Sequence, residues 1–129
     1  MIQIKRVYEP EAKSDGQRFL VERLWPRGVK KTKLPMVAWL KEVAPGTELR
    51  QWFNHDPLKW KEFQKRYGAE LNARPETWQP LLAAAKKGNL TLLFSAHDLE
   101  HNNAVVLKSF LEKRIKPTAK QITALTTRK

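Results

Sequence analysis

The sequence predicts a single α/β domain: a small, mostly parallel sheet with helices on both faces. Three observations support this class. Residues 2–8 alternate and are rich in β-branched side chains, which predicts a strand. Residues 90–95 are almost continuously apolar between turn signals, which is typical of a strand buried on both faces. Most of the sequence between these segments shows helical spacing of apolar residues, an order typical of parallel sheets.

The first third of the chain carries two strands and one helix in this prediction. Residues 2–8 form the first strand. Residues 18–25 form the second, and a lysine-rich connection follows it. Pro35 fits the first position of a helix, and the apolar run 36–40 predicts that this helix is buried.

The remainder of the chain is predicted to hold four helices and the central strand. Thr47 is expected to cap a short helix, and Asp56 caps a longer one that begins with proline. Helices at 78–87 and 104–113 flank the strand at 90–95. The tryptophans that fall on predicted helix faces are assigned to the core: Trp39, Trp52, Trp60 and Trp78.

The charge of the chain is strongly positive. It has 25 Lys and Arg against 13 Asp and Glu, a formal net charge of +12 in 129 residues. Six of the positive charges lie within residues 113–129, which contain no acidic residue. We therefore predict a folded domain at 1–112 and a basic, flexible tail at 113–129. A charge of this size bears on partners, nucleic acid among them, rather than on the fold.

Several classes of protein are excluded by composition. The chain has no cysteine, so it forms no disulfide, thiolate nucleophile or cysteine-ligated zinc site. No apolar stretch approaches the roughly 20 residues that span a bilayer, and the amino terminus lacks the apolar segment of a signal peptide. The five glycines form no phosphate-binding loop. We expect a cytoplasmic protein with no membrane partner, no metal and no cofactor.

The candidate site lies where the predicted strands end. Ligands of open parallel sheets bind beyond the carboxyl ends of the strands. This rule selects the loop after Tyr8, the loop at Trp25–Gly28 and the segment Ser95–Asp98, and we expect the three to converge.

The arginine-rich loop after the second strand predicts an anion site. Arg23 and Arg27 flank Trp25 in a loop stiffened by proline. Arginine binds carboxylate or phosphate through two parallel hydrogen bonds, and an indole can stack on a base or a sugar. Arg18 lies in a neighbouring segment and would enlarge this positive pocket. The structural alternative is that Arg23 pairs with a carboxylate of the fold and Trp25 fills the core.

A histidine-rich segment follows the last strand. His97 to His101 is similar to the zinc motif H-E-x-x-H, but that motif requires both histidines on one helix, and His97 directly follows a strand. No metal site is therefore predicted. Asp98 is expected to cap a helix whose first amides, through Asn102, favour an anion. His97 and Asp98 are then candidate acid–base or orienting groups. The alternative is a capping aspartate beside a solvent-facing histidine.

Two further candidates receive structural interpretations. His55 precedes Asp56, and adjacent residues in a helix cap seldom have the geometry of a catalytic dyad, so His55 is assigned to the cap. Ser95 lacks the surrounding nucleophile elbow, so a serine hydrolase is not predicted.

Taken together, these segments resemble the YeaO-like group, part of a large bacterial family of domains of unknown function. The similarity covers residues 2–112, and its most specific segments are Trp25–Gly28 and His55–Pro57. The resemblance implies a single α/β domain and brings no established activity. Relatives in the broader family carry Cys-His-Arg after the last strand, where this sequence has Asn102, Asn103 and Ala104, so thiol chemistry is not carried over.

Two functional hypotheses follow. The first is a pocket for a small anionic ligand, phosphorylated or nucleotide-like. The residues predicted to bind it are Arg18, Arg23, Trp25, Arg27 and Asn102. The second is a nucleic-acid-binding module in which the tail, Lys30, Lys31 and Lys33 neutralise backbone phosphates without reading sequence.

Overall fold

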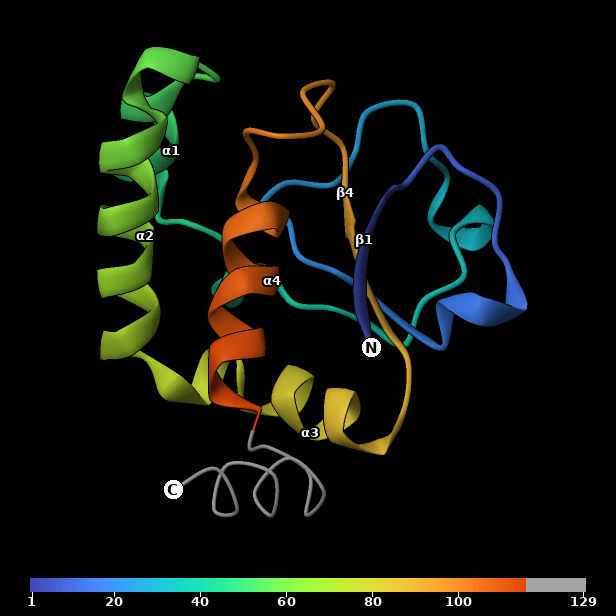
Figure 1. Cartoon of the computed structure of the whole chain (residues 1–129). Coiled ribbons are helices and arrows are strands. Elements are labelled where there is room, and N and C mark those ends of the chain that lie inside the picture. Colours follow the sequence, from blue (N-terminus) through green and yellow to red (C-terminus); the bar gives the residue numbers. More distant parts are fainter. Residues whose placement is uncertain (116–129) are drawn as a thin grey trace, which may run out of the picture.

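A computed structural model describes residues 1–115 of the chain, and its centre is a four-stranded parallel sheet (Figure 1). The order across the sheet is β1-β4-β2-β3. The strands are β1 (Ile2–Arg6), β2 (Gln17–Leu20), β3 (Ala38–Trp39) and β4 (Leu90–Phe94). All five residues of β4 are buried between β1 and β2, which confirms the central strand predicted at this position. The predicted α/β class is confirmed.

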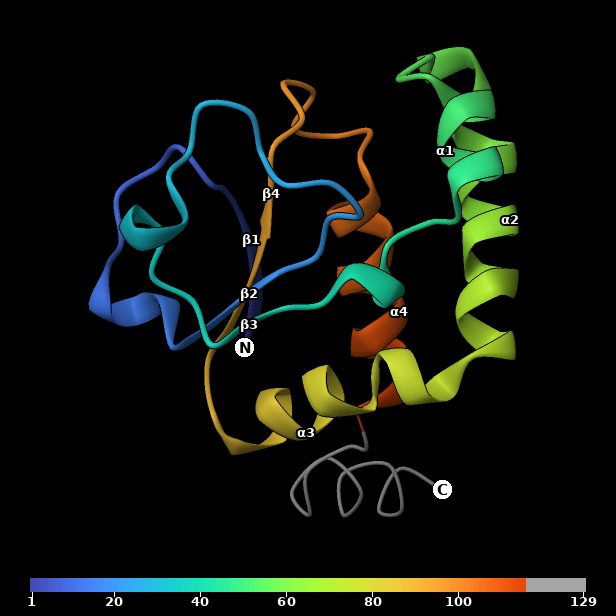
Figure 2. The same cartoon turned by 180° about the vertical axis from the view of Figure 1, so that it is seen from behind.

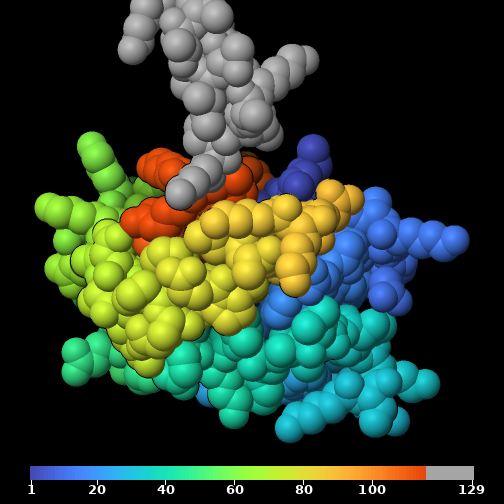
Figure 3. All heavy atoms as spheres, turned by 90° about the horizontal axis from the view of Figure 1, so that it is seen from below, coloured from blue at the N-terminus to red at the C-terminus, as the bar shows by residue number. Residues whose placement is uncertain are grey.

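Four α-helices accompany the sheet, and α1, α2 and α4 stand together on one side of it (Figures 1 and 2). They are α1 (Thr47–Phe53), α2 (Trp60–Ala73), α3 (Gln79–Lys87) and α4 (Asn103–Arg114). Short 3-10 turns occur at Lys13–Asp15, Lys31–Lys33, Lys41–Val43, Pro57–Lys59 and Pro75–Thr77. At the amino ends of the strands, α3 lies across the surface (Figure 3).

Alternation along the strands divides the apolar side chains between two cores. Leu92 and Phe94 of β4 join the main core, which the α-helices cover, and Leu93 points to the opposite face. There it packs with Leu20 under the connection between β2 and β3. Trp25 and other side chains of that connection complete the second core, so a loop with one helical turn covers this face.

The prediction of a buried helix at residues 36–40 is wrong. Ala38–Trp39 forms the edge strand β3, in which Ala38 lies opposite Phe19 of β2. A five-residue apolar run between a proline and a lysine is compatible with a short strand as well as with a helix, because a run of this length does not reveal its period. Trp39 therefore packs from a strand, with its ring edge toward Trp25 at a centroid distance of 5.2 Å.

Two helix boundaries also differ from the prediction. Thr47 is the first residue of α1, and Gly46 occupies the capping position before it. Helix α4 continues to Arg114, whose guanidinium lies 3.4 Å from the centre of the Phe110 ring. The first two residues of the predicted tail thus belong to a helix, and residues 116–129 lie outside the described part of the chain.

A buried ion-pair cluster joins the turn before β2 to the sheet. Asp15, 2% exposed, lies 2.6 Å from Arg18 Nη1 and 3.0 Å from Lys5 Nζ. Arg18 Nε donates to Pro35 O. Burial raises the pKa of Asp15, but the Ala12 amide and the two cations outweigh it and leave that pKa below its ordinary value. The Arg18 guanidinium is therefore held by contacts within the fold.

Candidate functional site

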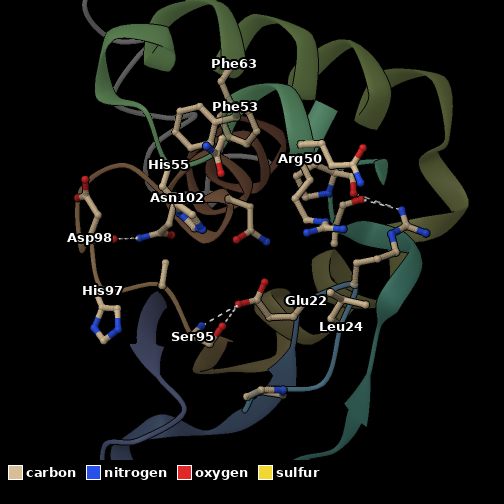
Figure 4. Close-up of a pocket in the computed structure, with 18 of the residues that line it drawn as sticks. Glu22, Leu24, Arg50, Phe53, His55, Phe63, Ser95, His97, Asp98 and Asn102 are labelled. Carbon is tan, nitrogen blue, oxygen red and sulfur yellow. Dashed lines mark hydrogen bonds between the residues drawn. The ribbon is translucent and has the colours of Figure 1, made fainter. Parts of the chain in front are cut away.

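A pocket of about 1000 Å³ lies at the carboxyl ends of the strands (Figure 4). Because all four strands are parallel, the segments that follow β2, β3 and β4 reach the same edge of the sheet, and the end of α1 closes the pocket from the side. The polar or charged lining residues are Glu22, Arg23, Arg27, Arg50, Gln51, Asn54, His55, Ser95, His97, Asp98, Asn102 and Asn103.

Hydrogen bonds join the end of β1 to the two pocket loops that we predicted would converge. Arg6 Nε donates to Ala96 O at 2.9 Å, and Tyr8 Oη donates to Arg27 O at 2.9 Å. Neither Arg6 nor Tyr8 lines the pocket. The end of β1 and Tyr8 thus contact the two other segments, while the loop that follows Tyr8 contributes no residue to the lining. The predicted convergence is confirmed only for the segments that follow β2 and β4. Arg18 also lies away from the lining, so its predicted contribution to the pocket is wrong: Asp15 holds its guanidinium in the fold.

Arg23 and Trp25 line the pocket, and both also have structural partners. Arg23 Nη2 donates to Ala44 O at 3.1 Å, and its Nη1 lies 3.5 Å from a carboxylate oxygen of Glu42. Trp25 Nε1 donates to Val29 O at 2.6 Å. Arg23 Nε is buried without an acceptor among the described residues. These contacts match the structural alternative weighed for both residues, because they fix the loop that forms the pocket wall.

Arg27 and Arg50 differ from Arg23 in having free guanidinium groups. Both residues are exposed and line the pocket, one from the loop after β2 and the other from α1. Within residues 1–115, neither guanidinium has a hydrogen bond or an ion pair. Sequence reasoning selected Arg27 and missed Arg50, which lies on the exposed side of a short helix.

Glu22 is the pocket residue that the sequence prediction missed most clearly. Its Oε1 accepts hydrogen bonds from the amide and the hydroxyl of Ser95, each at 2.7 Å (Figure 4). Its main-chain oxygen accepts from Trp39 Nε1 at 2.6 Å. Burial raises the pKa of Glu22 above its ordinary value, and the Ser95 hydrogen bonds together with the charges of His55 and Arg50 oppose that rise.

His97 and Asp98 lie on the loop that follows β4. His97 is exposed, with Nδ1 3.5 Å from Arg6 Nη2. Asp98 Oδ1 accepts from the amides of Glu100 and His101, and Oδ2 lies 2.9 Å from His101 Nδ1. The Glu100 amide, followed by the contacts with His101, holds the pKa of Asp98 below its ordinary value. Asp98 thus organises a turn.

The predicted helix start at Asp98 is wrong, because α4 begins at Asn103 and Asn102 is its cap. Asn102 Oδ1 accepts from the Val105 amide at 3.1 Å, and its Nδ2 donates to Asp98 O at 2.8 Å. Asn102 lines the pocket, but these bonds occupy its side chain. No three histidine, aspartate or glutamate side chains within residues 1–115 are grouped as metal ligands.

A left-handed bend after α1 places His55 in the pocket wall. Asn54 and His55 have φ angles of 45° and 56°, a region that few residues other than glycine occupy. His55 packs beside Phe53, with ring centroids 6.3 Å apart. Asp56 accepts from the Leu58 amide and is a cap, as predicted, but it caps the 3-10 turn Pro57–Lys59, and α2 begins only at Trp60. Assigning His55 to that cap did not anticipate its position in the pocket.

The described residues contain no helix long and apolar enough to cross a membrane. Comparison with known proteins gives a match to the family model described as "Inactive DUF488-N3 subclade" over residues 1–126. The chain is 47% identical over 110 residues to "Uncharacterized protein YeaO" of Escherichia coli, covering 85% of this chain and 96% of that protein.

Two mycobacterial proteins share a shorter region with the chain. "Uncharacterized protein Rv3073c" of Mycobacterium tuberculosis and "Uncharacterized protein Mb3100c" of Mycobacterium bovis are each 45% identical over 71 residues. That region covers 55% of this chain and 60% of each relative. No solved structure shows significant similarity to the chain.

Proposed function

The chain belongs to the inactive DUF488-N3 subclade, and from this premise we propose that its pocket binds a small anionic ligand, phosphorylated or nucleotide-like. The description of the subclade as inactive supports binding rather than catalysis. The volume of about 1000 Å³ is at the upper end of the range of small-molecule sites.

The observation that carries this proposal is the pair of guanidinium groups on the pocket wall, those of Arg27 and Arg50, that have no partner within residues 1–115. Arginines with no protein partner are suited to bind carboxylate or phosphate through two parallel hydrogen bonds each. Arg23 adds positive charge, and its bonds to Ala44 and Glu42 keep the loop in place.

The acidic groups of the pocket already accept hydrogen bonds from the protein on one or both oxygens. Glu22 accepts two hydrogen bonds from Ser95, and Asp98 accepts two from main-chain amides. These donors stabilise the two carboxylates in place, and the three arginines of the lining outnumber them. An anion that approaches Arg27 and Arg50 therefore meets net attraction.

Calorimetric titration with inorganic pyrophosphate tests the proposal. The full chain is expected to bind with one site, and Arg27→Ala or Arg50→Ala is expected to weaken binding by about 10- to 100-fold, the usual cost of one hydrogen bond to a charged group. Arg66→Ala is the matched control, because Arg66 is an exposed arginine on α2, outside the pocket lining. Equal affinity in all four proteins, or no binding to the unsubstituted chain, contradicts the proposal.

The nucleic-acid alternative is tested with the same protein. Fluorescence anisotropy with a labelled oligonucleotide at about 50 and about 200 mM salt measures the contribution of backbone contacts. Lys30, Lys31 and Lys33 lie on an exposed turn of the connection between β2 and β3. Steep loss of binding with salt and on replacing these lysines, without pyrophosphate binding, would favour the alternative.

A further inference from the structure

We propose that Glu22 is a specificity-determining residue of the pocket, and that its free carboxylate oxygen selects anionic ligands that also carry N–H donors on a flat ring. This inference rests on the proposed function and narrows its ligand class. It assigns the arginines to the anionic group and Glu22 to the ring, as in a nucleotide with amino or imino groups on its base.

Hydrogen bonds fix both the main chain and the carboxylate of Glu22. Trp39 Nε1 donates to its main-chain oxygen at 2.6 Å, and Ser95 holds Oε1 through its amide and its hydroxyl. A glutamate held in this way loses little conformational entropy when a ligand binds. In Figure 4 the carboxylate of Glu22 points into the pocket.

The remaining acceptor capacity of Glu22 faces the ligand space. A carboxylate has about four lone-pair positions, and the Ser95 donors use two of them on Oε1. Among the described residues, no donor reaches Oε2, although Glu22 lines the pocket. A partly buried carboxylate oxygen of this kind is best satisfied by N–H donors of a ligand.

Aromatic side chains line the side of the pocket that lies across from Glu22 (Figure 4). Phe53 and Phe63 are almost fully buried and stack on each other with centroids 4.2 Å apart, and the exposed His55 ring lies beside Phe53 at a centroid distance of 6.3 Å. Planar heterocycles pack favourably on an accessible aromatic ring such as that of His55. Arg50 lies on α1, just before His55, so the pocket lining holds an accessible aromatic ring together with a carboxylate oxygen and a guanidinium that have no partner within residues 1–115.

Three probes with the same phosphate group separate the contribution of the ring from that of its N–H donors. Guanosine 5′-monophosphate carries N–H donors on its base, purine riboside 5′-monophosphate has the ring without these donors, and ribose 5-phosphate has no ring. In calorimetric titrations of the full chain, we expect the guanine nucleotide to bind about 10- to 100-fold more tightly than purine riboside 5′-monophosphate. Ribose 5-phosphate is expected to bind most weakly.

Two variants test the role of Glu22 itself. Glu22→Gln can keep an acceptor for Ser95 and presents an amide donor in place of the free oxygen. Glu22→Asp keeps the charge, but its side chain is one methylene shorter, so the carboxylate lies farther from the ligand. Both are expected to abolish most of the preference for the guanine nucleotide. Glu48→Gln, an exposed position on α1 outside the pocket lining, is the matched control and keeps the preference.

The outcomes separate this inference from the proposed function. Pyrophosphate binding that depends on Arg27 and Arg50, without preference among the three probes, overturns the assignment of Glu22 alone. A preference that survives in both Glu22 variants overturns it as well. Absence of pyrophosphate binding to the unsubstituted chain contradicts the proposed function itself.

Discussion

Replacement of Asp15 by Asn is expected to destabilise the fold strongly. Asp15 and Arg18 are 2% and 4% exposed, and the carboxylate also contacts Lys5 at 3.0 Å and the Ala12 amide at 3.1 Å. The substitution leaves the Arg18 cation buried without its counter-charge. Breaking a buried ion pair from one side costs about 3–5 kcal/mol, a large share of the roughly 5–15 kcal/mol that stabilises a domain.

Urea unfolding followed by tryptophan fluorescence measures this loss. Glu62→Gln is the control, because Glu62 forms an exposed pair with Arg66 on α2, for which about 0.5 kcal/mol or less is expected. A loss below about 1 kcal/mol for Asp15→Asn would refute the interpretation that this cluster is a buried ion pair of structural importance.

The pH dependence of unfolding follows from the same group. The folded pKa of Asp15 lies below its ordinary value of 3.8, so the carboxylate contributes stability above that pH and loses it as the pH falls through the lowered folded pKa. The unsubstituted chain is expected to lose stability more steeply than Asp15→Asn in this acidic range. Parallel curves for the two proteins would contradict the assignment.

Three further substitutions test local features of the fold by thermal or urea unfolding. Gly16→Ala is expected to cost more than about 2 kcal/mol, because Gly16 has a φ of 64° and its added Cβ would collide with the main chain of Asn89; a near-neutral effect would mean that this close approach does not exist. Tyr67→Phe is expected to cost about 1–3 kcal/mol, since the buried hydroxyl donates to Val43 O at 2.6 Å, and unchanged stability would contradict that bond. His55→Gly is expected to be about 1 kcal/mol more stable than His55→Ala, because only glycine adopts a φ of 56° without strain, and the reverse order would argue against the left-handed bend.

Much of the fold was predictable because its signals are local. The run at 90–95 lies between turn signals, which favours a buried central strand, and Phe63, Tyr67 and Leu71 of α2 repeat at helical spacing on its buried face. The segment 36–40 was mispredicted because five apolar residues are too few to show whether the pattern repeats every two residues, as in a strand, or every 3.6, as in a helix. Its pairing with β2 is a tertiary interaction that the segment itself does not encode.

The location of the pocket was predictable from the sequence, but the identity of its residues was less so. The parallel-sheet rule located the pocket, and Arg27 lies on its wall as expected. Glu22 was missed because its burial depends on Ser95, 73 residues later in the chain. Arg18 was misassigned because Asp15, its partner in the turn before β2, reads in the sequence as part of an ordinary surface loop. The resemblance to the YeaO-like group covers residues 2–112, which include Glu22 and Arg50, but it gave no reason to single them out.

The most direct measurement is a two-dimensional 1H–15N NMR titration of the full chain with inorganic pyrophosphate. We predict saturable shift changes concentrated in the amides of residues 22–27, 50–55 and 95–98, together with the side-chain Nε–H signals of Arg27 and Arg50. Changes concentrated at residues 30–33 or 113–129, or the absence of saturable changes, would contradict an anion-binding pocket at the carboxyl ends of the strands.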